Sequence, residues 1–131
     1  MSGTYLLDTS AAIARINQDS DAVQVMEQAE ELFLPIVALG ELFGGAEHSK
    51  RIQSNFSRIE QLAMECTIIA CDLDTARLYG RISHQLRVKG RPIPQNDVWI
   101  AALAIQHNLT LLTRDAHFSE VDGLLLTGWQ Q

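Results

Sequence analysis

The stretch Thr4-Tyr5-Leu6-Leu7-Asp8-Thr9-Ser10 sets a pattern that the rest of the chain repeats. A short apolar run ends at an acidic residue, and a polar segment suited to start a helix follows at once. Short apolar runs then alternate with longer amphipathic segments, which predicts strands alternating with helices. This alternation is typical of a parallel sheet covered on both faces. We therefore expect an α/β fold, a three-layer αβα sandwich around a mainly parallel sheet of four to five strands.

The same periodicity gives the bounds of the expected elements. The expected strands are Thr4–Leu7, Leu32–Ile36, Thr67–Ala70, Thr110–Thr113 and Leu124–Thr127. The expected helices are Ser10–Ile16, Asp21–Glu31, Ala38–His48, Lys50–Met64, Asp74–Lys89 and Asp97–His107. Ser10 and Asn96 are the expected N-terminal caps of the helices that they begin or precede, and Gly90 is an expected helix stop.

Size and composition favour one domain spanning residues 1–131, because 131 residues with 47% apolar content can bury a proper core. No apolar run approaches the roughly 20 residues that a membrane span needs. No basic segment precedes an apolar stretch at the N-terminus, so we expect no signal peptide and a cytoplasmic protein. Cys66 and Cys71 flank an expected strand and would lie on opposite faces, so we expect no disulfide between them.

Four acidic residues lie in apolar surroundings and are the candidate site. Asp8 and Asp115 each follow an expected strand, Glu41 lies inside an apolar helix, and Asp97 begins one. Ligand sites of open α/β sheets form beyond the carboxyl ends of the strands, so we expect these side chains to converge there. A buried charge without a partner is costly, and few basic residues lie near them. A shared divalent cation is the simplest partner.

The ligand chemistry and the overall charge agree with that interpretation. An all-oxygen ligand set suits Mg²⁺ or Mn²⁺ rather than zinc, and we expect one or two such ions. The formal net charge of −6 argues against a broad basic face for nucleic acid. The four acids supply −4 of that charge, and two bound divalent cations would bring the total to −2, which is compatible with a nucleic-acid substrate held through metal ions and a few arginines. Arg91 and Arg114 lie near the acids in sequence and are candidate contacts to a phosphate backbone.

Four segments, in order, resemble the acidic motifs of PIN-domain ribonucleases. They are Leu6-Leu7-Asp8-Thr9-Ser10, Ala38-Leu39-Gly40-Glu41-Leu42, Gln95-Asn96-Asp97-Val98-Trp99 and Leu112-Thr113-Arg114-Asp115 followed by Phe118. The chain length and the tail Leu124–Trp129 further resemble the VapC toxins of bacterial toxin–antitoxin pairs. Trp99 departs from the family pattern, which more often has a smaller aliphatic residue there.

The resemblance implies a metal-dependent endoribonuclease that cleaves RNA phosphodiester bonds. The acidic roles of the family would fall on Asp8, Glu41, Asp97 and Asp115, with Thr9 supporting the first acid and Thr113 the last. It also implies a homodimer, neutralised by a VapB-like antitoxin in a heterotetramer or a larger complex. Nothing in the sequence identifies the RNA or its cleavage site.

Two other classes of function remain open at this point. A magnesium-dependent phosphotransfer domain also places acids at a sheet edge. A haloacid dehalogenase would need a second Asp where Ser10 stands, and a receiver domain would need a late lysine, whereas no lysine follows Lys89. A non-catalytic metal-binding or protein-interaction module would keep the cation but leave RNA intact.

Overall fold

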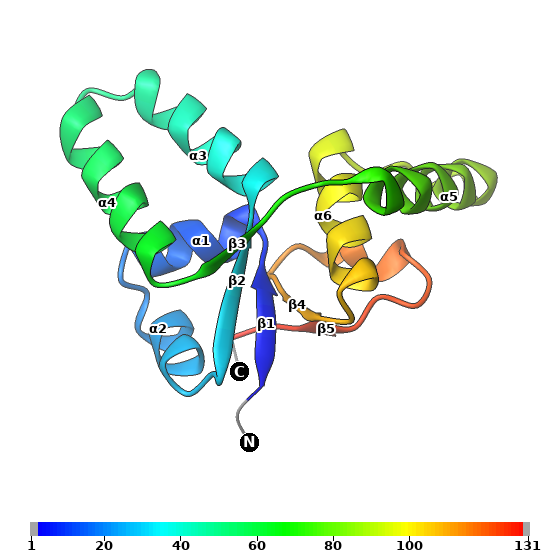
Figure 1. The fold of residues 1–131 in the computed structure, drawn as a ribbon, viewed down its shortest axis with the longest axis horizontal. Helices are drawn as coiled ribbons and strands as arrows, with labels where there is room; N and C mark the ends of the chain where they lie inside the picture. The colour runs from blue at the N-terminus through cyan, green and yellow to red at the C-terminus, as the bar shows by residue number, and fades with distance from the viewer. Residues whose placement is uncertain (1–2, 130–131) are drawn as a thin grey trace.

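A parallel sheet of five strands lies at the centre of the computed structural model, which describes residues 3–129. Its order is β3-β2-β1-β4-β5, and each neighbouring pair is parallel. The strands are β1 (Thr4–Leu7), β2 (Glu31–Pro35), β3 (Thr67–Ile69), β4 (Thr110–Leu112) and β5 (Leu126–Thr127). The first strand of the chain is therefore central, and its carboxyl end lies beside that of β4 (Figure 1).

Helices cover both faces of this sheet. They are α1 (Thr9–Ile16), α2 (Ser20–Glu27), α3 (Ile36–Glu47), α4 (Ile52–Met64), α5 (Leu73–Lys89) and α6 (Gln95–Gln106), with a short 3₁₀ helix η1 (Ala116–Glu120). Side chains of successive strand residues point to opposite faces. Leu7 accordingly packs in one core with α1–α4, while Leu6 packs in a second core with α5 and α6. The expected three-layer αβα sandwich is confirmed.

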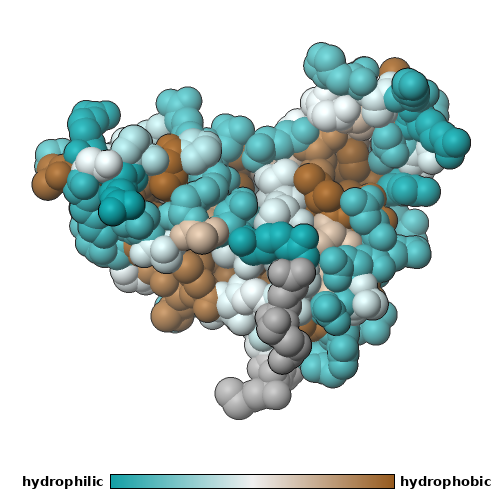
Figure 2. All heavy atoms as spheres, turned by 180° about the vertical axis from the view of Figure 1, so that it is seen from behind, coloured by the Kyte–Doolittle hydropathy of each residue, from teal (hydrophilic) through white to brown (hydrophobic). Residues whose placement is uncertain are grey.

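The α3–α4 pair and the α5–α6 pair project beyond the carboxyl end of β1 and diverge, one to each side of it (Figure 1). These two helix pairs form two lobes, which are visible from behind in the space-filling view (Figure 2). Apolar patches interrupt a mostly hydrophilic surface in this view. No helix among residues 3–129 is long and apolar enough to cross a membrane. The sheet edge between the two lobes is where the candidate acids were expected.

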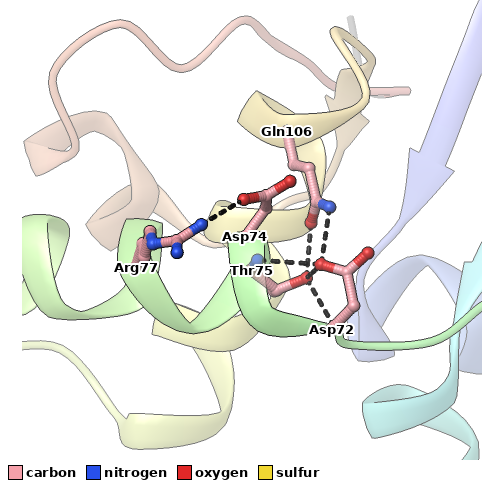
Figure 3. A network of polar contacts seen from close by, with 5 residues as sticks. All are labelled: Asp72, Asp74, Thr75, Arg77 and Gln106. Carbon is pink, nitrogen blue, oxygen red and sulfur yellow. Dashed lines mark hydrogen bonds and ion pairs between the residues drawn. The ribbon is translucent and has the colours of Figure 1, made fainter.

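A polar network holds the C-terminal end of α6 against the start of α5 (Figure 3). Asp72 caps α5, and the buried Thr75 completes a capping box with it. The Gln106 amide nitrogen donates to the Asp72 carboxylate at 2.9 Å, and its amide oxygen lies 2.5 Å from the Thr75 hydroxyl.

Elsewhere along the helix pair, Trp99 stacks on Tyr79 with ring centroids 4.2 Å apart. The bulky residue that departs from the family pattern therefore packs against α5.

Most element bounds agree with the sequence prediction to within two residues, and three details differ. The helix expected to end at Glu31 ends at Glu27, because Glu31 pairs with Thr4 as the first residue of β2. The expected caps Ser10 and Asn96 are wrong. Asp8 caps α1 with its side chain, and α6 begins after Pro94, whose fixed φ suits a helix start.

Two smaller predictions are confirmed. Gly90 ends α5 in the left-handed conformation, with φ of 71°, which a residue without a Cβ adopts at little cost. Cys66 and Cys71 are both free thiols. Burial raises the pKa of the Cys66 thiol to about 11, so it stays protonated at neutral pH.

Candidate active site

Strand pairing brings two of the predicted acids to one edge of the sheet. Leu7 pairs with Leu112, the last residues of β1 and β4, and the Asp8 amide donates to the Leu112 carbonyl at 3.3 Å. Asp8 and the segment from Thr113 to Asp115 therefore leave the sheet side by side. Residues separated by more than a hundred positions in the chain become neighbours because the two strands are parallel and adjacent.

Asp8 is the most tightly held of the four acids. Its side chain is 1% exposed, and both carboxylate oxygens accept hydrogen bonds. One oxygen accepts from the Ser10 hydroxyl at 2.7 Å and from the Ala11 amide at 2.8 Å, which caps α1. The other accepts from the Thr113 hydroxyl at 2.5 Å. A carboxylate has about four acceptor sites, so three of them are occupied and the orientation of the group is fixed.

Thr113 also positions the fourth acid. Its hydroxyl oxygen accepts the backbone N–H of Asp115 at 3.0 Å while its proton is donated to Asp8. A single buried hydroxyl thereby links the first acid to the turn that carries the last one.

Glu41 reaches the site from α3, five residues after that helix begins. The Thr9 hydroxyl donates to its carboxylate at 2.7 Å, so α1 and α3 are joined beside Asp8. The resemblance placed Thr9 as a support of Asp8, whereas its hydroxyl supports Glu41 in the structure. Glu41 is exposed, which leaves its other oxygen accessible to a ligand.

Asp97 lies in the first turn of α6 and contacts a histidine that follows β4. The imidazole Nε2 of His117 is 2.7 Å from Asp97 Oδ2. His117 belongs to η1, the same short turn that begins just after Asp115. One ligand atom from each of Asp97, Asp115 and His117 lies within 4.8 Å of the other two.

Electrostatic coupling shows that the acids share one environment. Burial raises the pKa of Asp8, and the negative charge of Asp115 raises it further, while the hydrogen bonds from Thr113, Ser10 and Ala11 oppose the rise. Burial likewise raises the pKa of Asp97. Contact with His117 opposes that rise, and the charges of Glu41 and Asp8 add to it. Carboxylates that repel one another in this way lack a compensating positive charge.

The acids fit a divalent cation. Among the described residues, no lysine or arginine forms an ion pair with Asp8, Glu41 or Asp115, and Asp97 pairs with His117 alone. Hard oxygen donors that are pre-oriented, partly buried and mutually repulsive are the donor set that Mg²⁺ or Mn²⁺ prefers. Residues that would hold the ion are Asp97 and Asp115 most directly, together with Asp8 and Glu41, whose charges act on Asp97.

The two predicted basic residues differ in their surroundings. Arg114 lies between Thr113 and Asp115, 4.9 Å above the buried ring of Trp129, and its guanidinium is 3.5 Å from Asp19. It is therefore held at the margin of the site by weak contacts. Arg91 is exposed after α5, and no side-chain hydrogen bond or ion pair of Arg91 occurs within residues 3–129.

Sequence reasoning had no means of ranking His117 above the three other histidines. Its only signal was position, two residues after Asp115, which places both side chains on one turn. Ser10 was expected as a helix cap and instead orients the Asp8 carboxylate. A contact of this kind depends on which way a short side chain turns, and spacing alone does not determine that.

Comparison with known proteins identifies the fold. The family model described as the PIN domain matches residues 5–124. The chain belongs to the PIN-domain family. This PIN domain is 28% identical to Ribonuclease VapC2 of Rickettsia felis, over 97% of its own length and 98% of that protein.

Two solved structures resemble this PIN domain over nearly their whole length. One is the complex of VapBC2 from Rickettsia felis bound to a DNA fragment of its promoter, with a TM-score of 0.90, 28% identity, and coverage of 97% of this chain and 99% of that one. The other is VapBC-1 of nontypeable Haemophilus influenzae, with a TM-score of 0.87, 26% identity, and coverage of 98% and 99%.

Proposed function

We propose that this PIN domain is an endoribonuclease of the VapC toxin type, with residues 1–131 forming one nuclease domain, of which 1–2 and 130–131 lie outside the described residues. The observation that carries the proposal is the convergence of the acids at the carboxyl edge of the sheet: Thr113 links Asp8 to the turn of Asp115, and ligand atoms of Asp97 and Asp115 lie within 4.8 Å of each other. Similarity along the full length to a protein named a ribonuclease supports RNA as the substrate.

The residues of the chain have separate tasks in this proposal. Asp97 and Asp115, together with Glu41 and Asp8, would hold one or two Mg²⁺ or Mn²⁺ ions. Thr113 and Ser10 are positioning residues in this proposal, because both donate hydrogen bonds that fix the Asp8 carboxylate. Arg114, held only by weak contacts, can turn toward a phosphate of the RNA backbone. When bound, such an ion makes a coordinated water easier to deprotonate and stabilises charge developing on the phosphate.

The test is cleavage of a labelled single-stranded RNA by purified protein. We expect cleavage in Mg²⁺ or Mn²⁺, none in excess EDTA, and a loss of about 100-fold or more in Asp97→Asn. The matched control is Asp74→Asn, an exposed acid in the first turn of α5 whose only ion pair within residues 3–129 is with Arg77. Cleavage by Asp97→Asn at the wild-type rate, or cleavage indifferent to EDTA, contradicts the proposal. Ion binding without RNA cleavage would instead favour the non-catalytic module.

Partners follow from the same relationship. Structures similar to this chain are VapBC complexes, which supports a VapB-like antitoxin as the partner that neutralises it. We also propose a homodimer, assembled with antitoxin into a heterotetramer or larger complex in the cytoplasm. An apolar groove of about 290 Å³ between α1, α3 and α4 has Thr9 and Glu41 among its lining residues, and also Ile13, Leu42 and Ile59.

That groove is the surface on which we expect an inhibitory segment to lie. A partner bound there covers apolar side chains and approaches Glu41, so it would obstruct the acids while it binds. The chain carries a net charge of −6, so a basic residue on the inhibitory segment would complement it. Co-purification with the product of the neighbouring gene tests this pairing, and growth arrest by this chain alone tests the toxin assignment.

A further inference from the structure

One side chain of the acidic site is not an oxygen donor. His117 Nε2 lies 2.7 Å from Asp97 Oδ2, and the imidazole is half-buried at the sheet edge. The turn that carries it is anchored by the next residue, Phe118, which is fully buried in the second core and lies 4.9 Å from the imidazole, centroid to centroid. A buried anchor directly beside it holds the imidazole near the acids.

The spacing of three ligand atoms is close to that around one octahedral ion. Metal–ligand bonds of about 2.1 Å place neighbouring ligand atoms about 3 Å apart and opposite ones about 4 Å apart. One ligand atom each from Asp97, Asp115 and His117 lies within 4.8 Å of the others, and the closest contact, at 2.7 Å, joins Asp97 to His117. Small side-chain movements would bring all three to bonding distance of a common point.

The other two acids have less freedom to join them. Both oxygens of Asp8 already accept hydrogen bonds, and one oxygen of Glu41 accepts from Thr9, so that only the other Glu41 oxygen is open to a ligand. On the imidazole, only Nε2 has a hydrogen-bond partner among the described residues. Nδ1 is therefore free to carry the ring proton while Nε2 offers its lone pair to a cation.

From these contacts we propose that His117 is a nitrogen ligand of the site ion, and that it biases the site toward Mn²⁺ over Mg²⁺. This inference rests on the proposed function, because it assumes the divalent cation. Mg²⁺ keeps to oxygen ligands, whereas imidazole binds transition-metal ions, so replacing one oxygen by nitrogen disfavours Mg²⁺. The sequence alone suggested an all-oxygen set, and the structure adds one nitrogen to it.

A second role for the same contact must be separated from ligation. His117 could hold Asp97 in place through the hydrogen bond and never touch the ion, as outer partners of metal ligands do. His117→Gln distinguishes the two roles, because the glutamine amide can still donate to Asp97. A positioning role survives this substitution, and nitrogen ligation by imidazole does not.

The decisive readout is pulsed electron paramagnetic resonance of the full chain loaded with Mn²⁺, without RNA. We expect nitrogen modulation from a directly bound imidazole in the wild type, its loss in His117→Gln, and its retention in the control His107→Gln, which alters an exposed histidine at the far end of α6. Mn²⁺ bound to the wild type without nitrogen modulation overturns the inference and leaves the proposed nuclease standing. Failure of the wild type to bind Mn²⁺ or Mg²⁺ overturns both.

Affinities give a second, independent measurement. Calorimetric titration should show Mn²⁺ binding weakened about tenfold or more in His117→Gln, while Mg²⁺ binding changes less than about threefold. Unchanged binding of both ions in His117→Gln means that the histidine only positions Asp97, and equal losses for both ions mean that it does not choose the metal; either result contradicts the proposal.

Discussion

Replacing Asp97 by asparagine should make the metal-free protein more stable, although most substitutions destabilise by about 1 kcal/mol. Burial disfavours the charged form of Asp97, and the charges of Glu41 and Asp8 disfavour it further. Asparagine is nearly isosteric, carries no charge and can keep a hydrogen bond to His117. What is lost is the charge on that hydrogen bond.

The balance between burial, charge repulsion and the lost contact with His117 decides whether Asp97→Asn stabilises or destabilises the protein. Because the pKa of Asp97 is raised despite the contact with His117, folding disfavours the charged form of Asp97 relative to the unfolded chain. Discounted for partial solvent screening, removing the charge should stabilise by on the order of 1 kcal/mol. In a chain of this size that corresponds to a rise in Tm of roughly 3–5 °C.

The effect also has a direction in pH. A carboxyl group whose pKa is higher in the folded than in the unfolded protein does not lower the stability of the fold at a pH below its ordinary pKa of 3.8. It lowers the stability most at a pH above the raised pKa of the folded protein. The advantage of Asp97→Asn should therefore be absent near pH 3.5, appear as the pH rises through the folded pKa, and be complete by neutrality.

Thermal unfolding in EDTA, followed by circular dichroism at several pH values, measures this effect. Asp74→Asn is the control, because Asp74 is exposed and its ion pair with Arg77 should change stability by less than about 0.5 kcal/mol. If Asp97→Asn were less stable than the wild type at pH 7 in EDTA, the carboxylates would not be electrostatically frustrated and the argument for a cation would fail. Saturating Mn²⁺ should reverse the order, since the ion binds the wild type more tightly.

Three further predictions concern other parts of the chain. Thr113→Val removes the hydrogen bond to Asp8 and the acceptor of the Asp115 amide. The free energy of unfolding, measured in urea, should fall by about 2–3 kcal/mol, and RNA cleavage should slow. Thr113→Ser keeps the hydroxyl and should retain most of the stability and of the activity. Thr75→Val removes the hydroxyl that accepts the Asp72 amide in the capping box of α5 and donates to Gln106, so it should lower the free energy of unfolding by about 1–2 kcal/mol without changing the cleavage rate per folded molecule. Ile13→Asp places a charge in the apolar groove and should weaken antitoxin binding about tenfold or more by calorimetry while RNA cleavage persists; unchanged affinity would exclude the groove as the docking surface.

The fold was largely predictable because its signals are local. Each strand is a short apolar run, each helix has a continuous amphipathic or apolar face, and alternation of the two implies a parallel sheet. Errors arose where tertiary pairing overrides local preference. Glu31 has no strand-like character alone, and it joins β2 because Thr4 on β1 supplies its partner.

That the acids gather at the carboxyl edge of the sheet was predictable for a related reason. A carboxylate next to a buried strand or inside an apolar helix is conspicuous in sequence, and parallel strands bring their ends together. Their supporting contacts were not predictable. Whether Thr9 bonds to Asp8 or to Glu41, and which histidine meets Asp97, depends on side-chain directions that only packing determines.

Anomalous diffraction from crystals soaked in Mn²⁺ tests the central claim, a shared cation site at the carboxyl edge of the sheet. We predict one strong manganese peak, about 2.1–2.3 Å from carboxylate oxygens of Asp97 and Asp115, with His117 Nε2 in the same shell. Manganese bound elsewhere on the protein, or no ordered manganese between these side chains at saturating concentration, would contradict the account.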